Sequence, residues 1–298
     1  MQYGDTRAVD GLSLSVERGT ITAVLGPNGA GKTTTLETCE GYRKPQGGTV
    51  RVLGLDPRAQ ARELLPRIGV MLQEGGAWSG ARAPEMLRHI ASLHAHPLDP
   101  ALLEERLGLA ECGRTAYRRL SGGQKQRLGL AMALVGRPEV VFVDEPTAGL
   151  DPAVRRTVWA LFDELREDGV TTVLTTHYMD EAEKLADQIH IIDRGRLIAS
   201  GSPIQLTRGS TLSTIRLVVT KPFPPGAPDS LKAALGDHIE VVLLDELSLI
   251  VTGPADASTL AKVSAWCESN DVLPESLTLG TRNLEDVFLQ LTGRELAP

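Results

Sequence analysis

The sequence predicts an α/β fold followed by a small α+β unit, and three features of the chain carry this prediction. The apolar run "TITAVL" leads through "GPNGAGKT" into the helix-like "KTTTLETCEGY". A second apolar run, Val140 to Val143, is typical of a strand covered on both faces and ends in two carboxylates. From Ser210 onward, short strand-like and helix-like runs alternate.

The glycine-rich segment from Gly26 to Thr33 predicts a phosphate-binding loop, because it follows a strand and opens a helix. Glycines let the backbone curl so that its amide groups point at phosphate oxygens, and the helix dipole adds positive potential there. Lys32 supplies a full positive charge, and the Thr33 hydroxyl can ligate Mg²⁺. A glycine-rich turn with an exposed lysine is the alternative. The candidate nucleotide-binding residues are Gly26, Pro27, Asn28, Gly29, Ala30, Gly31, Lys32, Thr33 and Thr34.

Two adjacent carboxylates, Asp144 and Glu145, end the apolar run in "VVFVDEPTAGLD". Ligands of open α/β sheets bind at the carboxyl ends of strands, so these residues should emerge beside the glycine loop. Asp144 is suited to hold Mg²⁺, and Glu145 to accept a proton from an attacking water. A charged strand end without function is the alternative interpretation.

A second possible anion site lies in "LSGGQKQR", from Leu120 to Arg127. Ser121 occupies the position of a helix N-cap, and the backbone amides that follow it lack acceptors within the helix. This is an anion site without a lysine, which one chain with one nucleotide would not need. Its candidate residues are Ser121, Gly122, Gly123 and Gln124.

Composition limits the class of protein. The 298 residues are 42% hydrophobic and carry a net charge of −7, which argues against a general nucleic-acid binder. No apolar run is long enough to span a membrane and no secretory signal is evident, so we expect a cytoplasmic protein. The three cysteines form no C-x-x-C pair, and His89, His94 and His96 do not share one helical face, so a zinc site is not expected.

In this order, Tyr3, "GPNGAGKTT", Gln73, "LSGGQ", "VVFVDEP", "AGLD" and His177 resemble the nucleotide-binding subunit of an ATP-binding cassette (ABC) transporter. The resemblance implies a P-loop NTPase cassette with a helical signature subdomain at about 76–135. It implies an ABC ATPase domain over residues 1–209 and a C-terminal α+β accessory domain over 210–298.

The same resemblance implies roles for the site residues, with ATP and Mg²⁺ as cofactors. The catalytic residues are Glu145, His177 and Gln73, and the metal ligands are Thr33, Gln73 and Asp144. Tyr3 is the residue that stacks on adenine. Taken alone, a glutamine or histidine at a strand end is more often solvated or structural; their order along the chain favours function.

The resemblance also answers why one chain carries two phosphate sites. In the family, two cassettes meet head to tail, and ATP lies between the Lys32 loop of one and the Ser121 loop of the other. Asp151 resembles a residue of the loop that crosses this interface. The implied partners are a second cassette, of this chain or of a paralogue, and a separately encoded transmembrane permease, with the ATPase peripheral on the inner face of the membrane.

The C-terminal "LEDVFLQLTGR" resembles the end of bacterial drug-exporter ATPases of the daunorubicin-resistance kind, which implies export. Its apolar stripe consists of Leu284, Val287, Phe288 and Leu291, and Met86, Leu87, Ile90 and Leu93 form another stripe in the helical insert. A soluble ABC-type ATPase acting on nucleic acid or ribosomes is the alternative. No long coiled coil separates Lys32 from Leu120, and only one cassette is present, which disfavours that alternative.

The beginning of the chain departs from the family pattern. The segment "GLSLSVERGTITAVLG" alternates as a strand should, but the edge strand that usually precedes the adenine-stacking aromatic is missing. We hypothesise that the start is truncated or assigned too late, which would leave a strand edge unpaired and Tyr3 loosely held.

Overall fold

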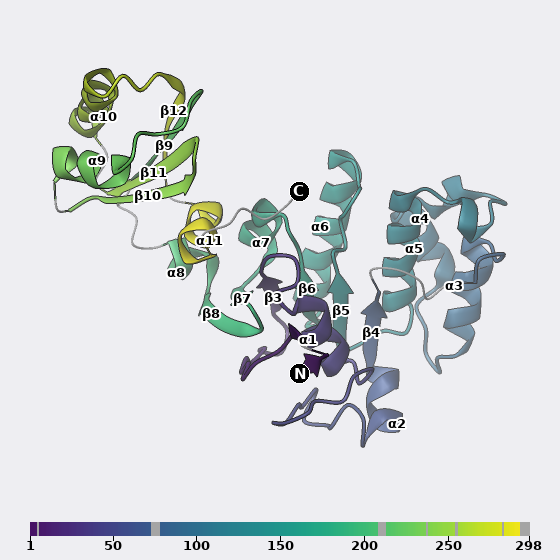
Figure 1. The fold of residues 1–298 in the computed structure, drawn as a ribbon. Helices are drawn as coiled ribbons and strands as arrows, with labels where there is room; N and C mark the ends of the chain where they lie inside the picture. Colours follow the sequence, from purple (N-terminus) through teal and green to yellow (C-terminus); the bar gives the residue numbers. More distant parts are fainter. Residues whose placement is uncertain are drawn as a thin grey trace. The chain divides into compact units, whose positions relative to one another are not determined.

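The computed structural model describes residues 1–4, 6–72, 78–207, 213–236, 238–253, 256–281 and 283–292. The chain divides into a first unit over Met1–Ser200 and a second unit that begins at Gly201 (Figure 1). The predicted domain boundary after residue 209 falls in a segment outside the described residues, and the domain assignment stays a prediction.

A six-stranded sheet forms the centre of the first unit, in the order β4-β5-β6-β3-β7-β8. Its strands are β3 (Ile21–Leu25), β4 (Ile68–Met71), β5 (Val140–Asp144), β6 (Thr171–Thr175), β7 (Gln188–Asp193) and β8 (Arg196–Gly201). β3 pairs in parallel with β6 and β7, and β5 pairs in parallel with β4 and β6. Every residue of β3, β5 and β6 is buried, as a parallel sheet covered on both faces requires. The predicted α/β class is confirmed.

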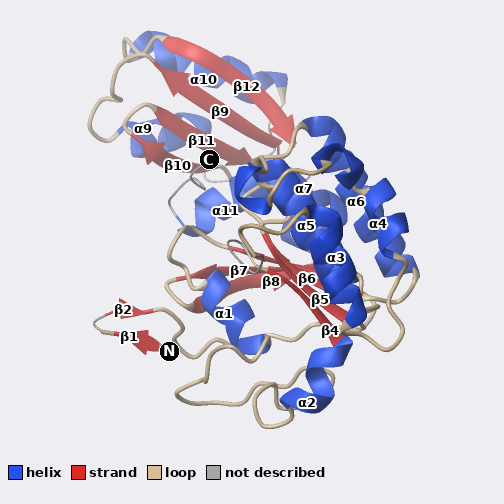
Figure 2. Cartoon of the chain, turned by 90° about the vertical axis from the view of Figure 1, so that its right-hand side faces the viewer, coloured by secondary structure: helices blue, strands red, loops and turns tan. Residues whose placement is uncertain are grey.

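Helices cover both faces of this sheet, with α1 on one side and α6 and α7 on the other (Figure 2). The helices of the first unit are α1 (Lys32–Cys39), α2 (Ala61–Leu64), α3 (Ala83–Ser92), α4 (Pro100–Arg106), α5 (Gly122–Leu134), α6 (Pro152–Glu167) and α7 (Met179–Leu185). Short 3₁₀ turns lie at Leu65–Arg67, Leu109–Cys112 and Tyr117–Arg119. Among these described residues no helix is both long and apolar enough to cross a lipid bilayer.

The apolar stripe predicted in the helical insert is only partly right. Met86 and Leu87 of α3 are buried, and Ile90 is half-buried. Leu93 is 68% exposed, because α3 ends at Ser92 and Leu93 is its C-cap, where the chain turns away from the helical path. The prediction for Leu93 is wrong.

The strand expected after Gly11 is absent. Leu12, Leu14 and Val16 are half-buried while the residues between them are exposed, so the predicted alternation is present without strand pairing. These apolar side chains line a cavity of about 1110 Å³ over the inner sheet residues, and no described strand lies alongside to complete a ladder. The chain instead begins with a short hairpin of β1 (Gln2–Tyr3) and β2 (Thr6–Arg7).

The second unit has the split β-α-β topology of ferredoxin-like folds. Its core elements follow in the order β9 (Ser213–Val219), α9 (Ala227–Leu235), β10 (Glu240–Asp245), β11 (Ser248–Gly253), α10 (Ala257–Ser269) and β12 (Pro274–Thr281). The sheet order is β10-β11-β9-β12, with every neighbouring pair antiparallel. Two further helices, α8 (Pro203–Thr207) and α11 (Leu284–Thr292), flank this core. The predicted "DSLKAALG" helix begins two residues earlier than Asp229 because Pro228 fits a first helical turn.

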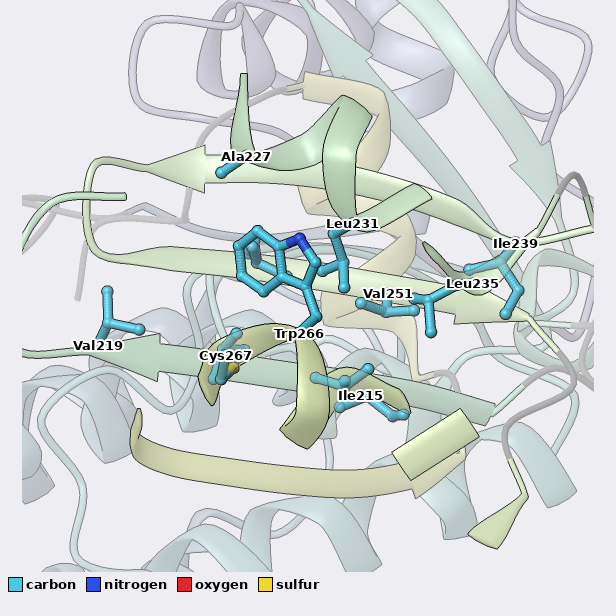
Figure 3. Close-up of a cluster of buried hydrophobic side chains, with 12 residues drawn as sticks. Ile215, Val219, Ala227, Leu231, Leu235, Ile239, Val251, Trp266 and Cys267 are labelled. Atoms are coloured by element: carbon cyan, nitrogen blue, oxygen red, sulfur yellow. The ribbon is translucent and has the colours of Figure 1, made fainter. Parts of the chain in front are cut away.

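A separate hydrophobic core holds the second unit together. Figure 3 shows the Trp266 indole at the centre of this cluster, beside Leu231 of α9. The buried indole nitrogen donates to the Ser230 hydroxyl at 3.1 Å, so its polar group is satisfied. Ile215 and Val251 supply the facing sheet surface. One sheet face is therefore sealed by α9 and α10.

The C-terminal helix α11 is tied to the sheet by polar contacts. Thr214 donates to Asp286 at 3.1 Å, and Gln290 donates to Glu240 at 2.6 Å. The predicted apolar stripe is confirmed for Leu284, Val287 and Phe288, all of which are buried. It is wrong for Leu291, which is 44% exposed, whereas Leu289 is buried in its place.

Substitutions at two glycines can test the close packing of α5 on β4. A Cβ at Gly69 of β4 would lie 2.0 Å from the Ala133 carbonyl oxygen, whereas a Cβ at Gly129 of α5 would lie 3.5 Å from Met71 Cγ. We expect Gly69→Ala to lower the free energy of unfolding by about 3 kcal/mol through overpacking. The matched variant Gly129→Ala should raise that free energy by about 0.5–1 kcal/mol, as is usual for a helix interior. Urea denaturation followed by circular dichroism measures both, and similar effects of the two substitutions would contradict this packing.

Candidate functional site

The carboxyl ends of three parallel strands bring the predicted site residues to one edge of the sheet. In the register of β3 and β6, Val24 lies beside Thr175, and in that of β5 and β6, Asp144 lies beside Thr175. The glycine loop follows β3, Glu145 follows β5 and His177 follows β6. The sheet therefore gathers residues that are more than a hundred positions apart in sequence.

The glycine loop between β3 and α1 has a shape that only glycine permits at two of its positions. A Cβ at Gly26 would lie 2.3 Å from the Ile192 carbonyl oxygen. At Gly31, φ is +102°, and a Cβ would lie 2.2 Å from the Ala8 carbonyl oxygen. The backbone of the loop is thus packed directly against neighbouring backbone, and α1 begins immediately afterwards at Lys32.

Lys32 is 7% exposed, and its ammonium group donates to the carbonyl oxygens of Gly26 at 2.6 Å and Pro27 at 3.3 Å. Burial lowers the pKa of Lys32, and the nearby carboxylates of Glu145 and Asp144 partly oppose that shift. A buried cation inside a loop is stabilised by an anion placed beside it. This position suits an ammonium group that contacts phosphate oxygens.

Asp144 is 6% exposed and joins three elements through hydrogen bonds. It accepts from the Thr33 hydroxyl at 2.9 Å and from the Thr175 hydroxyl. A hydroxyl and a carboxylate at the mouth of the glycine loop are the oxygen ligands that Mg²⁺ takes together with substrate phosphates. Among the described residues, no group of three or more His, Cys, Asp or Glu side chains could hold a metal ion by itself. A metal ion here would therefore need ligands of other kinds, such as hydroxyl and phosphate oxygens. Gln73, the third predicted ligand, lies outside the described residues.

Glu145 is held in an uncommon backbone conformation, with φ of +53°. Its amide donates to the Thr175 carbonyl oxygen at 3.1 Å, and its own carbonyl accepts from the Gln126 side chain at 2.8 Å. A non-glycine residue in this region costs about 1–3 kcal/mol and persists only where the surroundings impose it, often at functional sites. The contact with Gln126 connects Glu145 to α5.

His177 lies next to Glu145, with 3.4 Å between its Nδ1 and the Glu145 Oε1. Both side chains are largely buried. The His177 ring packs against Tyr178 with centroids 4.1 Å apart, and the Arg155 guanidinium lies 4.1 Å from the centroid of the Tyr178 ring. The structure therefore brings together two of the three predicted catalytic residues, while Gln73 is not described.

The predicted second anion site is a helix N-terminus closed by a capping box. The Ser121 hydroxyl accepts from the Gln124 amide at 3.2 Å, and the Gln124 side chain accepts from the Ser121 amide at 3.0 Å. Ser121 and Gly122 are exposed, and Gly122 has open space where a side chain would be. These contacts stay within the cap of α5, and the helix start is accessible to solvent at Ser121 and Gly122.

Two further predicted residues have contacts that sequence reasoning did not foresee. Tyr3 is 43% exposed, and Arg43 covers its ring at 5.1 Å from the centroid while donating to the phenol oxygen at 3.1 Å. Asp151 caps α6 by accepting from the amides of Ala153 and Val154, and these hydrogen bonds lower its pKa.

Three residues of the site escaped the sequence prediction. Thr175 and Gln126 position Asp144 and Glu145, and their only signal is placement, at a strand end and within "LSGGQKQR". Glu40 is 5% exposed, and its Oε2 has no hydrogen-bond partner among the described residues. Burial, and then the charges of Asp144 and Glu37, raise the pKa of Glu40 to about 8. In sequence it resembles an ordinary charged residue near a helix end.

A buried parallel sheet, a glycine loop with its lysine, and a carboxylate and histidine at the neighbouring strand ends define a nucleoside triphosphate hydrolase. Residues 9–148 match the family model described as ABC transporter. The chain belongs to the ABC transporter family, as an ATP-binding subunit with ATPase activity, which confirms the resemblance inferred from its motifs.

Curated relatives match nearly the whole chain. Daunorubicin resistance ATP-binding protein DrrA3 of Streptomyces coeruleorubidus is 38% identical over 98% of this chain and 93% of its own length. The Nod factor export ATP-binding protein I of Ralstonia nicotianae is 35% identical over 99% of this chain and 92% of its own length.

Solved structures match the cassette. A dimeric ATP-binding cassette, MJ0796, in a post-hydrolysis state with ADP and Pi, is 25% identical with a TM-score of 0.60, covering 68% of this chain and 94% of that one. The cbiO1 protein of Clostridium perfringens, part of the ABC transporter complex cbiONQ, is 27% identical with a TM-score of 0.57, covering 71% and 91%. Proteins similar to this chain thus occur as cassette dimers and within transporter complexes.

The raised pKa of Glu40 predicts how stability depends on pH. The unfolded carboxyl loses its proton near its usual 4.5, whereas the folded carboxyl keeps it up to about 8. Stability from this group is therefore full below pH 4.5 and is lost as pH rises to about 8. Glu40→Gln does not titrate, so its stability relative to the parent should rise over this window by a few kcal/mol, at about 1.4 kcal/mol per pKa unit.

Thermal or urea unfolding of Glu40→Gln and the parent at pH 5 and pH 9 measures this difference. Glu17→Gln replaces an exposed glutamate and is the matched control, for which we expect the pH dependence of the parent. A constant difference between Glu40→Gln and the parent at both pH values would show that Glu40 titrates normally.

Proposed function

We propose that this chain hydrolyses ATP to power the export of a small molecule, such as a drug, an antibiotic or a lipid-like compound, through a separately encoded membrane permease. The observation that carries this proposal is the convergence of Lys32, Asp144, Glu145 and His177 at one sheet edge. Export rather than uptake is supported by relatives named for daunorubicin resistance and Nod factor export. The sequence similarity to these relatives extends over the second unit as well. These names favour transport over action on nucleic acid or ribosomes.

The glycine loop supplies the binding site for the triphosphate. Its amide groups and the start of α1 surround the phosphates, and the Lys32 ammonium contacts the β- and γ-phosphates in place of the loop carbonyls. Tyr3 stacks on the adenine. The nucleotide-contacting residues of this half-site are Tyr3, Gly26, Pro27, Asn28, Gly29, Ala30, Gly31, Lys32, Thr33 and Thr34.

Thr33 and Asp144 would hold Mg²⁺, with Gln73 as a further ligand. At this position a metal ion would neutralise negative charge on the phosphates. The hydroxyl of Thr33 and the carboxylate of Asp144 are already adjacent, so this pair of ligands is preorganised by the fold.

Glu145 acts as the general base for hydrolysis. Its carboxylate accepts a proton from the water that attacks the γ-phosphorus, and its position at the end of β5 places it beside the glycine loop. His177, 3.4 Å from that carboxylate, contacts the γ-phosphate and orients the carboxylate. The backbone contacts of Glu145 with Thr175 and Gln126 keep the base in place.

The outward-facing start of α5 completes the nucleotide site of a second cassette. Ser121, Gly122, Gly123 and Gln124 bind the γ-phosphate of ATP held by the glycine loop of the partner, most simply a second copy of this chain. ATP therefore favours the closed dimer, and hydrolysis removes that preference. The dimer works at the inner face of the cell membrane, on the cytoplasmic side of its permease.

Substitutions at Lys32 and Glu145 separate binding from hydrolysis. We expect Lys32→Ala to abolish productive nucleotide binding, and Glu145→Gln to keep binding but slow turnover by about a hundredfold or more, as the loss of a general base does. Nucleotide titration and steady-state phosphate release measure the two effects. Glu167→Gln, an exposed carboxylate at the end of α6, is the matched control and should hydrolyse normally. Near-normal turnover of Glu145→Gln would refute the assigned role.

The shared site predicts a mass change that depends on ATP. In the Glu145→Gln background, Mg-ATP should increase the fraction of dimer measured by light scattering coupled to gel filtration. Adding Ser121→Arg should remove that increase, because the larger side chain fills the exposed helix start. An increase that survives Ser121→Arg would place the contact elsewhere, and a protein that stays monomeric with Mg-ATP despite normal nucleotide affinity would mean that a different cassette is the partner.

A further inference from the structure

One edge of the sheet in the second unit is open. β12 pairs with β9 along one side, and none of the other described strands pairs with its opposite side. A bulge interrupts the ladder between Pro274 and Ser276, after which pairing is regular from Ser276 to Thr281. This regular stretch contains no charged residue and no proline. Exposed strands of this kind are templates for pairing with another strand.

The opposite edge, β10, carries the features that prevent such pairing. Charged residues, Glu240 and Asp245, lie at both of its ends, and a bulge interrupts it between Leu243 and Asp245. Gln290 of α11 also donates to Glu240 at 2.6 Å. The two edges of one small sheet thus differ: β10 has a charged residue at each end, whereas the proline, Glu275 and bulge of β12 all lie at one end and leave Ser276 to Thr281 uncharged and regularly paired.

The open edge also exposes apolar surface on the helix-covered face of the sheet. Leu277 lies opposite Leu217 of β9 and packs against the core, and Leu279 lies opposite Ile215 on the same face. Leu279 is nevertheless 46% exposed, because no strand lies beyond it. A strand added to β12 would cover this side chain.

We propose that β12 is a self-association surface, at which the β12 strands of two copies pair antiparallel about a two-fold axis through Thr278. An axis perpendicular to the sheet keeps both helix-covered faces on one side, so only residues of the same face can lie opposite one another. With Thr278 on the axis, Leu277 of each copy lies opposite Leu279 of the other. The four leucines then form one apolar cluster, and two four-stranded sheets become continuous.

The strand complements itself, which is why a second copy is the occupant. Leucine lies opposite leucine and threonine opposite threonine, and no like charges face each other within the regular ladder. The choice of a second copy also rests on the proposed function, in which two cassettes already meet. Tethering by one contact raises the effective concentration at the other, so edge pairing would hold two subunits together when hydrolysis opens the nucleotide sites.

Site-specific cross-linking tests the pairing and its register in the full chain without nucleotide. Thr278→Cys should form a disulfide-linked dimer on mild oxidation, because opposite residues place their Cβ atoms about 5 Å apart. Ser276→Cys should not, since two such cysteines would be offset by about 13 Å along the strands. The native thiols of Cys112 and Cys267 are buried, and Cys39 is half-buried with its thiol pKa raised by burial to about 11, so the parent should give little dimer. Linkage through Ser276→Cys with none through Thr278→Cys would overturn the proposed register.

A matched pair of lysine substitutions tests the surface. In the Thr278→Cys background, Leu279→Lys should lower the cross-linked fraction by about tenfold or more, because burying an ammonium group among leucines is unfavourable. Leu243→Lys changes a leucine of similar exposure, 43% against 46%, on the other edge and should have no effect. Unchanged melting temperatures would show that both variants fold. Equal losses in both variants, or no cross-linking through Thr278→Cys, would overturn the proposal.

The Ser121→Arg substitution separates this interface from the nucleotide sandwich. Cross-linking through Thr278→Cys should persist in Ser121→Arg, since edge pairing needs no ATP. If it persists while ATP fails to increase the dimer fraction of Glu145→Gln carrying Leu279→Lys, in which the edge contact is weakened, the proposed sandwich fails and the edge interface stands. If ATP increases that fraction while Thr278→Cys gives no link, the edge interface fails alone.

Discussion

The buried carboxylate of Asp144 is the point on which the nucleotide site depends. Its hydrogen bonds to the hydroxyls of Thr33 and Thr175 tie the end of β5 to the start of α1 and to the end of β6. A carboxylate that is 6% exposed is stable only when its oxygens are satisfied, so these contacts fix where the three elements end relative to one another. The loop lysine, the candidate metal ligands and Glu145, the proposed base, are positioned by this arrangement.

Around that point, the site combines a rigid frame with groups kept in costly states. Glu145 has a positive φ, Lys32 is buried and donates to loop carbonyls, and Glu40 is a buried carboxyl with one oxygen that has no partner in the part of the chain that the structure describes. The surrounding sheet and helices hold each of these groups in its unfavourable state. The Gln126 side chain adds a physical link from α5 to the backbone of Glu145, so the helix capped by Ser121 is connected to the proposed general base of its own chain.

The two units contribute different structural features to the protein. The first unit gathers the candidate site residues at the carboxyl ends of a parallel sheet. The second unit has its own core around Trp266 and a ferredoxin-like sheet. The dimer contacts proposed for the two units depend on different interactions: the contact across the nucleotide depends on the γ-phosphate, and the contact at β12 does not. A transporter ATPase that must open and close repeatedly without losing its partner benefits from having both.

The sequence by itself determined the α/β class, the glycine loop, the carboxylate pair and the order of the motifs, because these depend on local patterns: apolar runs, glycines with a lysine, and capping residues. It did not determine that Thr175, Gln126 and Glu40 belong to the site, because their significance comes from strand register and burial, which join residues distant in the chain. The same limit explains the errors. The alternation from Leu12 to Val16 indicated a strand, but strand formation requires a partner. Leu93 and Leu291 fitted helical stripes but proved exposed, because helix ends and packing partners are set only by the tertiary structure.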